Sequence, residues 1–212
     1  MARAHDPFFI RRSLIAGALA AAGGAALAAR RQVVTLLGDS ITAGYGLPAG
    51  QALPARLQAA LVKLGSHALV RGAGVSGDTT AAGLARADFS VQPDTDVCVV
   101  ALGGNDLLEG LDPAAMRANL KEIIRKLKNR RIGVVLAGVR APAAVGAHYA
   151  RDFNAVFPVV AREERVSLYP DLLAGVGPAL RQADGVHPNA AGAAVIAARL
   201  APLIIRTMMV SR

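Results

Sequence analysis

Short runs of apolar residues alternate along the chain with longer segments in which apolar positions recur every three or four residues. The short runs are typical of strands buried on both faces, and they cover residues 32–37, 68–70, 97–102, 132–137 and 166–169. The longer segments carry the helical period and cover residues 53–64, 79–87, 113–128, 149–163 and 189–207. The pattern predicts five strand-helix units.

Alternating strands and helices predict an α/β fold, in which right-handed crossovers make the sheet parallel and doubly wound. The chain has 212 residues, of which 53% are hydrophobic and 18% charged, and this excludes a disordered chain and fits one domain over residues 30–212. Ligands of such sheets bind beyond the carboxyl ends of the strands. Functional residues are therefore expected in the loops that begin at Gly38, Arg71, Gly103 and Tyr169.

Two segments are apolar enough to raise the question of a membrane span. Residues 1–29 contain Arg11-Arg12 followed by a run rich in Ala, Gly and Leu, which is typical of a twin-arginine export signal and also fits Sec export. The run is short and weakly apolar for a retained anchor, so we expect cleavage and release to the periplasm or the exterior. The segment 189–207 is interrupted by residues that favour a helix packed in the core, namely Arg199, Pro202 and Arg206.

The net charge of +9 would suit nucleic acid or anionic lipid as a partner. The densest group of cations lies where the third predicted helix ends and consists of Arg125, Lys126, Lys128, Arg130 and Arg131. Cations there complement the helix dipole and stay solvated, and no aromatic residues are interleaved for base stacking. Nucleic acid is therefore not expected as a partner, and membrane contact is expected to be peripheral at most.

Two of the predicted loops supply candidates for acyl-transfer chemistry. The loop after the first strand holds Gly38-Asp39-Ser40, where a serine at a strand-to-helix turn can serve as an exposed nucleophile or simply as a helix N-cap. The loop after the third strand holds Gly103-Gly104-Asn105-Asp106, where the Asn105 amide can donate to an oxyanion or tolerate a left-handed turn.

The loop expected after the second strand begins with glycines spaced as Gly72-x-Gly74-x-x-Gly77. This spacing occurs in dinucleotide-binding turns, where Asp94 or Asp96 would stand near the ribose-binding distance. Such a turn normally belongs to the first strand-helix unit, however. The Gly77 N–H is instead a candidate oxyanion donor, and a plain glycine-rich turn is the remaining interpretation.

The segment Asp184-Gly185-Val186-His187-Pro188 precedes the last predicted helix. His187 can accept the serine proton as a general base, and Asp184 can fold back to fix the imidazole tautomer. Together, four loops at one edge of the sheet supply a nucleophile, a base with its orienting carboxylate and two further oxyanion donors. This combination predicts a serine hydrolase with Ser40, His187 and Asp184 as its catalytic residues.

These four blocks resemble, in order, those of the SGNH hydrolases, also called GDSL esterases and lipases, and the similarity covers residues 33–203. The resemblance implies a flavodoxin-like, three-layer α/β/α sandwich with a five-stranded parallel sheet. It also implies an oxyanion hole formed by the Ser40 N–H, the Gly77 N–H and the Asn105 amide. The activity implied is hydrolysis of acyl esters and thioesters without metal or cofactor.

The sequence around the blocks is similar to the bacterial subgroup of thioesterase I, lysophospholipase L1 and arylesterase, which implies a small acyl ester, thioester or lysophospholipid as substrate. The chain departs from relatives at Gly72-Ala73-Gly74, where they commonly carry Asn-Ala-Ser or Asn-Ala-Gly. A monomer is favoured, although the sequence does not fix the oligomeric state.

Three leucines follow Asn105 and are candidates for an acyl-chain groove, namely Leu107, Leu108 and Leu111. They could equally pack this loop onto the core. The competing functions are a carbohydrate acetylesterase with the same catalytic residues, a dinucleotide-binding oxidoreductase and a non-catalytic basic protein on anionic lipid.

Overall fold

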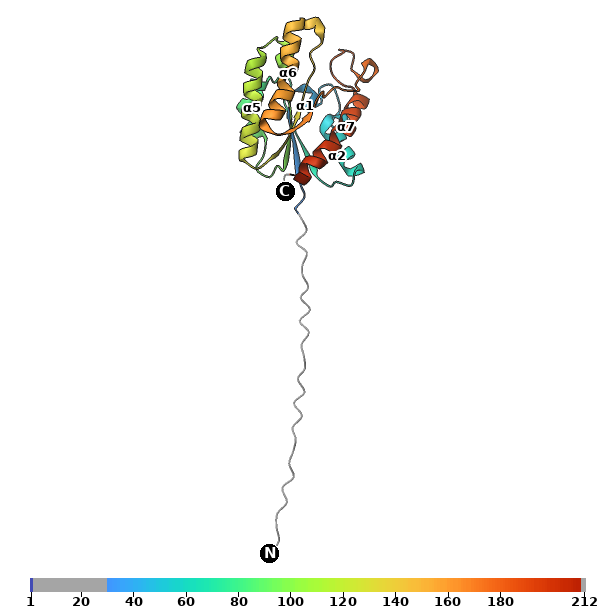
Figure 1. Cartoon of the computed structure of the whole chain (residues 1–212). Helices are drawn as coiled ribbons and strands as arrows, with labels where there is room; N and C mark the ends of the chain where they lie inside the picture. Colours follow the sequence, from blue (N-terminus) through green and yellow to red (C-terminus); the bar gives the residue numbers. More distant parts are fainter. Residues whose placement is uncertain (2–29, 211–212) are drawn as a thin grey trace. The chain divides into compact units, whose positions relative to one another are not determined.

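A five-stranded parallel sheet with strand order β2-β1-β3-β4-β5 organises residues 30–210, which together with Met1 are the residues that this computed structural model describes (Figure 1). The strands are β1 Val33–Gly38, β2 Leu69–Gly74, β3 Val97–Ala101, β4 Gly133–Ala137 and β5 Ser167–Tyr169. Every neighbouring pair is parallel, as the alternating pattern predicts. The predicted export signal lies outside the described residues, apart from Met1.

The central strands β1 and β3 are buried at every residue, which is why their sequences are continuous apolar runs. The prediction for the second strand was wrong in length: β2 ends at Gly74, not at residue 70. Its last residues pair with β1, where Gly38 lies opposite Gly74. As an edge strand that is partly exposed, β2 is extended by this pairing and needs no apolar run, so its sequence does not show its full length.

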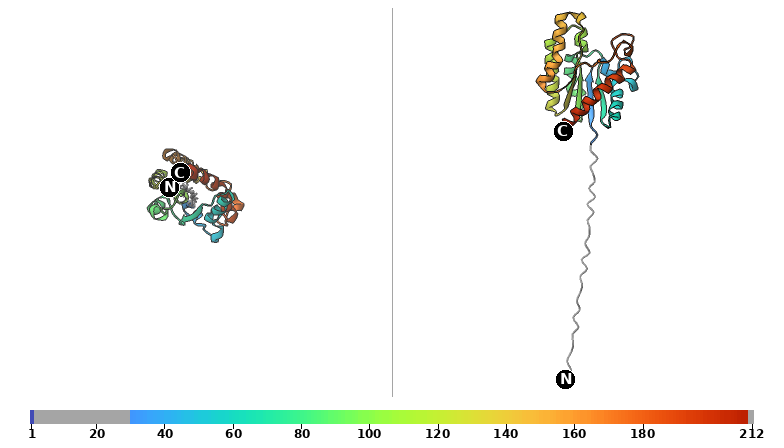
Figure 2. Two further views of the ribbon diagram at one scale, coloured as in Figure 1. Left: turned by 90° about the horizontal axis from the view of Figure 1, so that it is seen from below. Right: turned by 45° about the vertical axis from the view of Figure 1, so that its right-hand side comes forward.

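Helices cover both faces of the sheet (Figure 2). They are α1 Ser40–Ala43, α2 Leu53–Lys63, α3 Thr80–Ser90, α4 Gly104–Leu108, α5 Pro113–Asn129, α6 Ala147–Glu164 and α7 Ala190–Val210. One hydrophobic cluster joins the sheet to α3, α5 and α6, and a second joins it to α2 and α7. The structure thus confirms the predicted three-layer α/β/α arrangement.

Helix α7 is long and apolar enough to cross a membrane by length and composition, and it is the single such helix within residues 30–210. Its inner face is buried in the cluster shared with α2 and the sheet, where Ile196, Leu200 and Ile204 are fully inaccessible to solvent. Arg199 and Pro202 lie within it, as noted from the sequence. The prediction of a core-packing helix is confirmed.

The basic group at the end of α5 is more than a solvated face. Arg125 forms an ion pair with Glu164, and Lys126 forms one with Asp88. The Lys128 ammonium donates to the Glu164 carbonyl at 2.7 Å. The Arg130 guanidinium also donates to the Val91 carbonyl. These contacts fasten the end of α5 to α3 and α6, so four of the five cations predicted to be solvated have protein partners.

Candidate active site

Ser40 is the first residue of α1, directly after the turn that ends β1. Asp39 caps this helix by accepting the Ile41 N–H at 3.1 Å. Gly38 allows the turn because a Cβ at this position would lie 2.1 Å from Thr42 Oγ1. The result is a serine hydroxyl at a helix N-terminus, beyond the carboxyl end of the strand.

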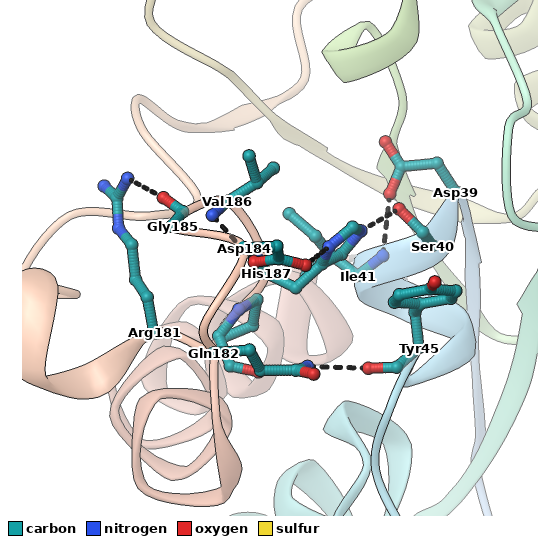
Figure 3. Close-up of polar contacts among 11 residues, drawn as sticks. Asp39, Ser40, Ile41, Tyr45, Arg181, Gln182, Asp184, Gly185, Val186 and His187 are labelled. Atoms are coloured by element: carbon teal, nitrogen blue, oxygen red, sulfur yellow. Dashed lines mark hydrogen bonds and ion pairs between the residues drawn. The ribbon is translucent and has the colours of Figure 1, made fainter.

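The imidazole of His187 lies between Ser40 and Asp184 (Figure 3). Its Nε2 is 2.8 Å from Ser40 Oγ, and its Nδ1 is 2.6 Å from Asp184 Oδ2. The structure therefore meets the spatial condition of the predicted serine-histidine pair, because residues 147 positions apart in the chain come within hydrogen-bonding distance.

Asp184 is held as a carboxylate by three hydrogen bonds. Besides its bond with the imidazole, its Oδ1 accepts the N–H groups of Val186 at 2.9 Å and His187 at 3.0 Å. The His187 bond and these two N–H groups lower the pKa of Asp184 from 3.8 to about 2. A carboxylate that stays ionised can fix the histidine tautomer.

The loop that carries His187 is closed on itself and attached to the segment after α1. The Gln182 N–H donates to the His187 carbonyl at 2.8 Å, and Arg181 Nη1 donates to the Gly185 carbonyl at 2.9 Å. Gln182 Nε2 also donates to the Tyr45 carbonyl at 2.7 Å (Figure 3). Sequence reasoning missed these supports, because nothing in the local pattern distinguishes Arg181 and Gln182 from ordinary surface residues.

A cavity of about 510 Å³ opens beside the Ser40 hydroxyl. Ser40, Gly77, Asn105 and His187 all line it. Within residues 30–210, neither the Ser40 N–H nor the Gly77 N–H donates a hydrogen bond to another group. Both are therefore available to a ligand oxygen, as oxyanion donors must be.

Gly77 adopts φ +88°, a left-handed conformation that favours glycine, and no atom lies within 4 Å of the position a Cβ would take. Asn105 lies on the short helix α4, although the sequence predicted a loop there. One N–H of its amide donates to the Asp78 carbonyl at 2.8 Å, which leaves the second available.

Asp106, the neighbour of Asn105, is a buried carboxylate that sequence reasoning left without a role. Its two oxygens accept the Thr80 N–H at 2.8 Å and the Thr80 hydroxyl at 2.6 Å. Asn119 Nδ2 donates to the same hydroxyl at 3.1 Å. Because Thr80 begins α3, Asp106 anchors α4 to the positive end of that helix and so fixes the backbone of Asn105.

Asp39 is a second buried carboxylate at the site, and it lines the cavity beside Ser40. Burial raises its pKa from 3.8 to about 6, against the opposing effect of its bond with the Ile41 N–H. A Cβ on Gly104 would lie 3.0 Å from Asp39 Oδ2, so the α4 backbone closes over this carboxyl group.

The interpretation of Gly72-x-Gly74-x-x-Gly77 as a dinucleotide turn is wrong. Gly72 and Gly74 belong to β2 and do not form a phosphate-binding loop. A Cβ on Gly74 would lie 2.3 Å from the Ala43 nitrogen, and one on Gly72 would lie 2.9 Å from the Pro54 ring. These glycines are required where β2 packs closely against α1 and α2.

The three candidate groove leucines divide between two environments. Leu107 and Leu108 line the cavity, and Leu107 also packs against the core. Leu111 is not among the residues that line the cavity, and its carbonyl instead accepts the Tyr149 hydroxyl at 2.9 Å. The structure therefore brings Leu107 and Leu108 to the cavity but not Leu111, which follows α4 in the chain, and the acyl-chain groove stays a prediction.

Comparison with known proteins supports these observations. The profile of the GDSL-like Lipase/Acylhydrolase family matches residues 36–195. Esterase TesA of Pseudomonas aeruginosa is 39% identical over 163 residues, which are 76% of this chain and 81% of that protein. Thioesterase 1/protease 1/lysophospholipase L1 of Escherichia coli K12 is 37% identical over 165 residues, which are 76% of this chain and 78% of that protein.

A solved structure shows the same similarity in three dimensions. The crystal structure of AlinE4, an SGNH-hydrolase family esterase, superimposes with a TM-score of 0.71 at 43% identity. The superposition covers 84% of this chain and 96% of AlinE4. The resemblance drawn from the four sequence blocks is confirmed, and the chain belongs to the GDSL-like lipase and acylhydrolase family.

Proposed function

We propose that this protein is a serine esterase that hydrolyses acyl esters and thioesters through an acyl-enzyme on Ser40. The observation that carries the proposal is the chain of short contacts from Ser40 Oγ through His187 to Asp184, 2.8 Å and 2.6 Å long, at the wall of a cavity. Membership of the family supports it, as does the description of similar proteins as esterases.

In acylation, Ser40 Oγ attacks the acyl carbonyl carbon while His187 Nε2 takes the hydroxyl proton. The electron pair of the carbonyl π bond moves to its oxygen. The resulting oxyanion accepts hydrogen bonds from the Ser40 N–H, the Gly77 N–H and the Asn105 amide. When the intermediate collapses, the bond to the leaving group breaks and His187 gives its proton to the departing alcohol or thiol.

Deacylation repeats these steps with water as the nucleophile. His187 takes a proton from water, the hydroxide oxygen bonds to the acyl carbon, and the oxyanion forms again in the same place. The bond from the acyl carbon to Ser40 Oγ then breaks, and His187 returns the proton to the serine. Asp184 remains ionised throughout and stabilises the imidazolium.

The walls of the cavity favour an acyl chain over a polar substrate. Ile41, Leu107, Leu172 and Leu173 are among the residues that line it. An apolar wall with a few polar groups at one end is typical of sites that hold a hydrocarbon by burial and orient its reactive end by hydrogen bonds. Small acyl esters, thioesters and lysophospholipids fit this chemistry, and the name of the Escherichia coli relative supports the same range.

The test is active-site labelling combined with substrate profiling. A fluorophosphonate probe should form one adduct, located on Ser40 by mass spectrometry, and Ser40→Ala should remove both labelling and turnover while the circular dichroism spectrum stays unchanged. Turnover is measured with p-nitrophenyl esters, acyl-CoA thioesters and acetylated sugars. Substantial activity in Ser40→Ala would disprove the nucleophile, and a preference for acetylated sugars would favour a carbohydrate acetylesterase.

We also propose that the protein is exported, because residues 1–29 combine Arg11-Arg12 with a weakly apolar run rich in small residues. The mature enzyme would then act in the periplasm or outside the cell. Fractionation of cells that express the full chain, followed by mass spectrometry of its N-terminus, tests the proposal. An uncleaved protein in the cytoplasmic fraction would contradict it, and Arg11→Lys with Arg12→Lys separates the twin-arginine route from Sec.

A further inference from the structure

Arg86 on α3 is a mostly buried cation that the mechanism leaves unused. Its side chain is 19% exposed and donates four hydrogen bonds. Nε donates to Asp78 Oδ2 at 2.5 Å, and Nη2 donates to the Gly38 carbonyl at 2.9 Å. Nη1 donates to the Ala73 carbonyl at 2.9 Å and to Ser90 Oγ at 3.0 Å.

Three of these acceptors lie in or next to the segments that carry the proposed oxyanion donors, namely Gly38, Ala73 and Asp78. Ala73 lies in β2, the strand that leads into the segment of Gly77. Gly38 ends β1, two residues before Ser40. Asp78 directly follows Gly77, and the Asp78 carbonyl in turn accepts the Asn105 amide at 2.8 Å. One guanidinium therefore joins the segments of Ser40 and Gly77 directly, and it reaches Asn105 through the residue that Asn105 contacts.

The segment of Gly77 needs such support. It follows β2, an edge strand, and it passes through a left-handed glycine with open space in front of it. Its backbone holds it with two hydrogen bonds: the Asp78 N–H donates to the Val75 carbonyl at 3.2 Å, and the Val75 N–H donates to the Gly38 carbonyl at 3.0 Å. The planar guanidinium donates to Ala73 before this segment and to Asp78 after Gly77. It therefore restricts the movement of the segment in a way that a flexible ammonium cannot.

We propose that Arg86 is a positioning residue that holds the three oxyanion donors in fixed positions relative to one another before the substrate binds. The proposal rests on the proposed function, since it needs an oxyanion to stabilise. Donors stabilise the transition state only when they are fixed where the negative charge develops. Losing Arg86 should therefore slow the chemical step and leave substrate binding in the apolar cavity almost unchanged.

The first measurement is kcat and KM of Arg86→Gln with a short p-nitrophenyl ester. We expect kcat to fall by about 10²-fold, the loss that a misplacement of about 1 Å can cause, while KM changes by less than about threefold because the cavity walls are intact. Arg71→Gln is the matched control: Arg71 lies on β2, its contacts with Asp94 are 2.8 and 3.0 Å long, and it is not among the residues that line the cavity. Its kcat should equal that of the wild type.

A double-mutant cycle separates positioning from a general loss of structure. If Arg86 acts through the oxyanion donors, Arg86→Gln should cost much less in an Asn105→Ala background than in the wild type. Equal losses in the two backgrounds would overturn the proposal. So would a folded Arg86→Gln with wild-type kcat.

A conservative variant covers the case in which Arg86→Gln does not fold. Arg86→Lys keeps the charge, but one ammonium cannot bond Gly38, Ala73 and Asp78 together, so its kcat should still fall by about tenfold or more while thermal unfolding shows a folded protein. Wild-type kcat in folded Arg86→Lys would overturn the proposal. Failure of the Arg86 proposal can be told apart from failure of the proposed function. If the proposed function were wrong, the wild-type protein would itself lack esterase activity and labelling at Ser40.

Discussion

The ring of Tyr45 lies against the imidazole of His187, with ring centroids 4.7 Å apart and planes inclined by 37° (Figure 3). An aromatic contact of this kind contributes about 0.5–1.5 kcal/mol. Tyr45→Leu should lower kcat/KM by up to about tenfold, because the imidazole loses the surface that limits its rotation. The measurement is kcat/KM for an acetyl ester.

Tyr45→Phe is the matched control, since it keeps the ring and removes the hydroxyl. It should retain kcat/KM within about twofold of the wild type, because the contact with His187 is made by the ring. An equal loss in Tyr45→Phe and Tyr45→Leu would assign the effect to the hydroxyl instead.

Asp184→Asn should lower kcat on the order of 10⁴-fold, because an amide that donates to the imidazole favours the wrong tautomer. The same change should alter acid stability. The pKa of Asp184 is lowered to about 2, so its carboxylate contributes stability above pH 3.8 that is lost as pH falls through about 2. Urea unfolding between pH 5 and pH 2 should show a smaller loss of stability in the variant. Parallel curves for the two proteins would contradict this assignment.

Asp39 should give stability a pH dependence opposite in sign to that from Asp184. Because burial raises its pKa from 3.8 to about 6, the folded state binds the proton more tightly than the unfolded state. The contribution of Asp39 to stability therefore falls as pH rises through the window from 3.8 to about 6, in total on the order of 3 kcal/mol.

Asp39→Asn tests this, because the amide oxygen can still accept the Ile41 N–H but does not titrate. The difference in free energy of unfolding between variant and wild type should shift in favour of the variant from pH 3 to pH 7. Any contribution from Asp184 cancels in that difference. A difference independent of pH would show that Asp39 does not titrate in this window.

Asn105→Ala should lower kcat by about 10²–10³-fold with little change in KM, as expected for one oxyanion donor. Asn105→Asp is the informative partner variant, since it fills the same space but presents acceptors where a donor is needed. It should be as slow as the alanine variant at neutral pH. Near-normal kcat in Asn105→Ala would remove the residue from the oxyanion hole.

Much of this architecture was predictable because its signals are local. The buried runs of β1 and β3 identify central strands without knowledge of their partners, and Ser40, Asn105 and His187 each follow a glycine-rich or charged segment that sequence alone marks as unusual. Parallel topology then places the loops at one edge of the sheet. The family resemblance supplied the link between them.

The remaining features depend on contacts between distant residues. Arg86 contacts Gly38, 48 positions away, and nothing in the sequence of α3 distinguishes this arginine from a solvent-exposed one. The length of β2 is likewise set by pairing with β1 rather than by its own pattern. Leu108 ends α4 and lines the cavity, whereas Leu111 follows the helix and is not among the lining residues, a difference that the local sequence does not show.

That difference between the leucines gives a matched pair of variants. Leu108 is 70% exposed and lines the cavity, whereas Leu111 is 37% exposed and is not among its lining residues. Leu108→Gln should reduce kcat/KM for a decanoyl ester about threefold to tenfold relative to an acetyl ester, since contact with a buried leucine-sized surface is worth roughly 1.5 kcal/mol. Leu111→Gln should leave the ratio unchanged.

Because both leucines are substantially exposed, neither substitution should unfold the protein, and thermal unfolding checks this directly. The ratio of decanoyl to acetyl kcat/KM cancels any general change in the catalytic residues, so it reports the chain-binding wall alone. Equal ratios in Leu108→Gln and the wild type would show that the acyl chain leaves the cavity by another wall. A changed ratio in Leu111→Gln would show that a bound chain extends past α4.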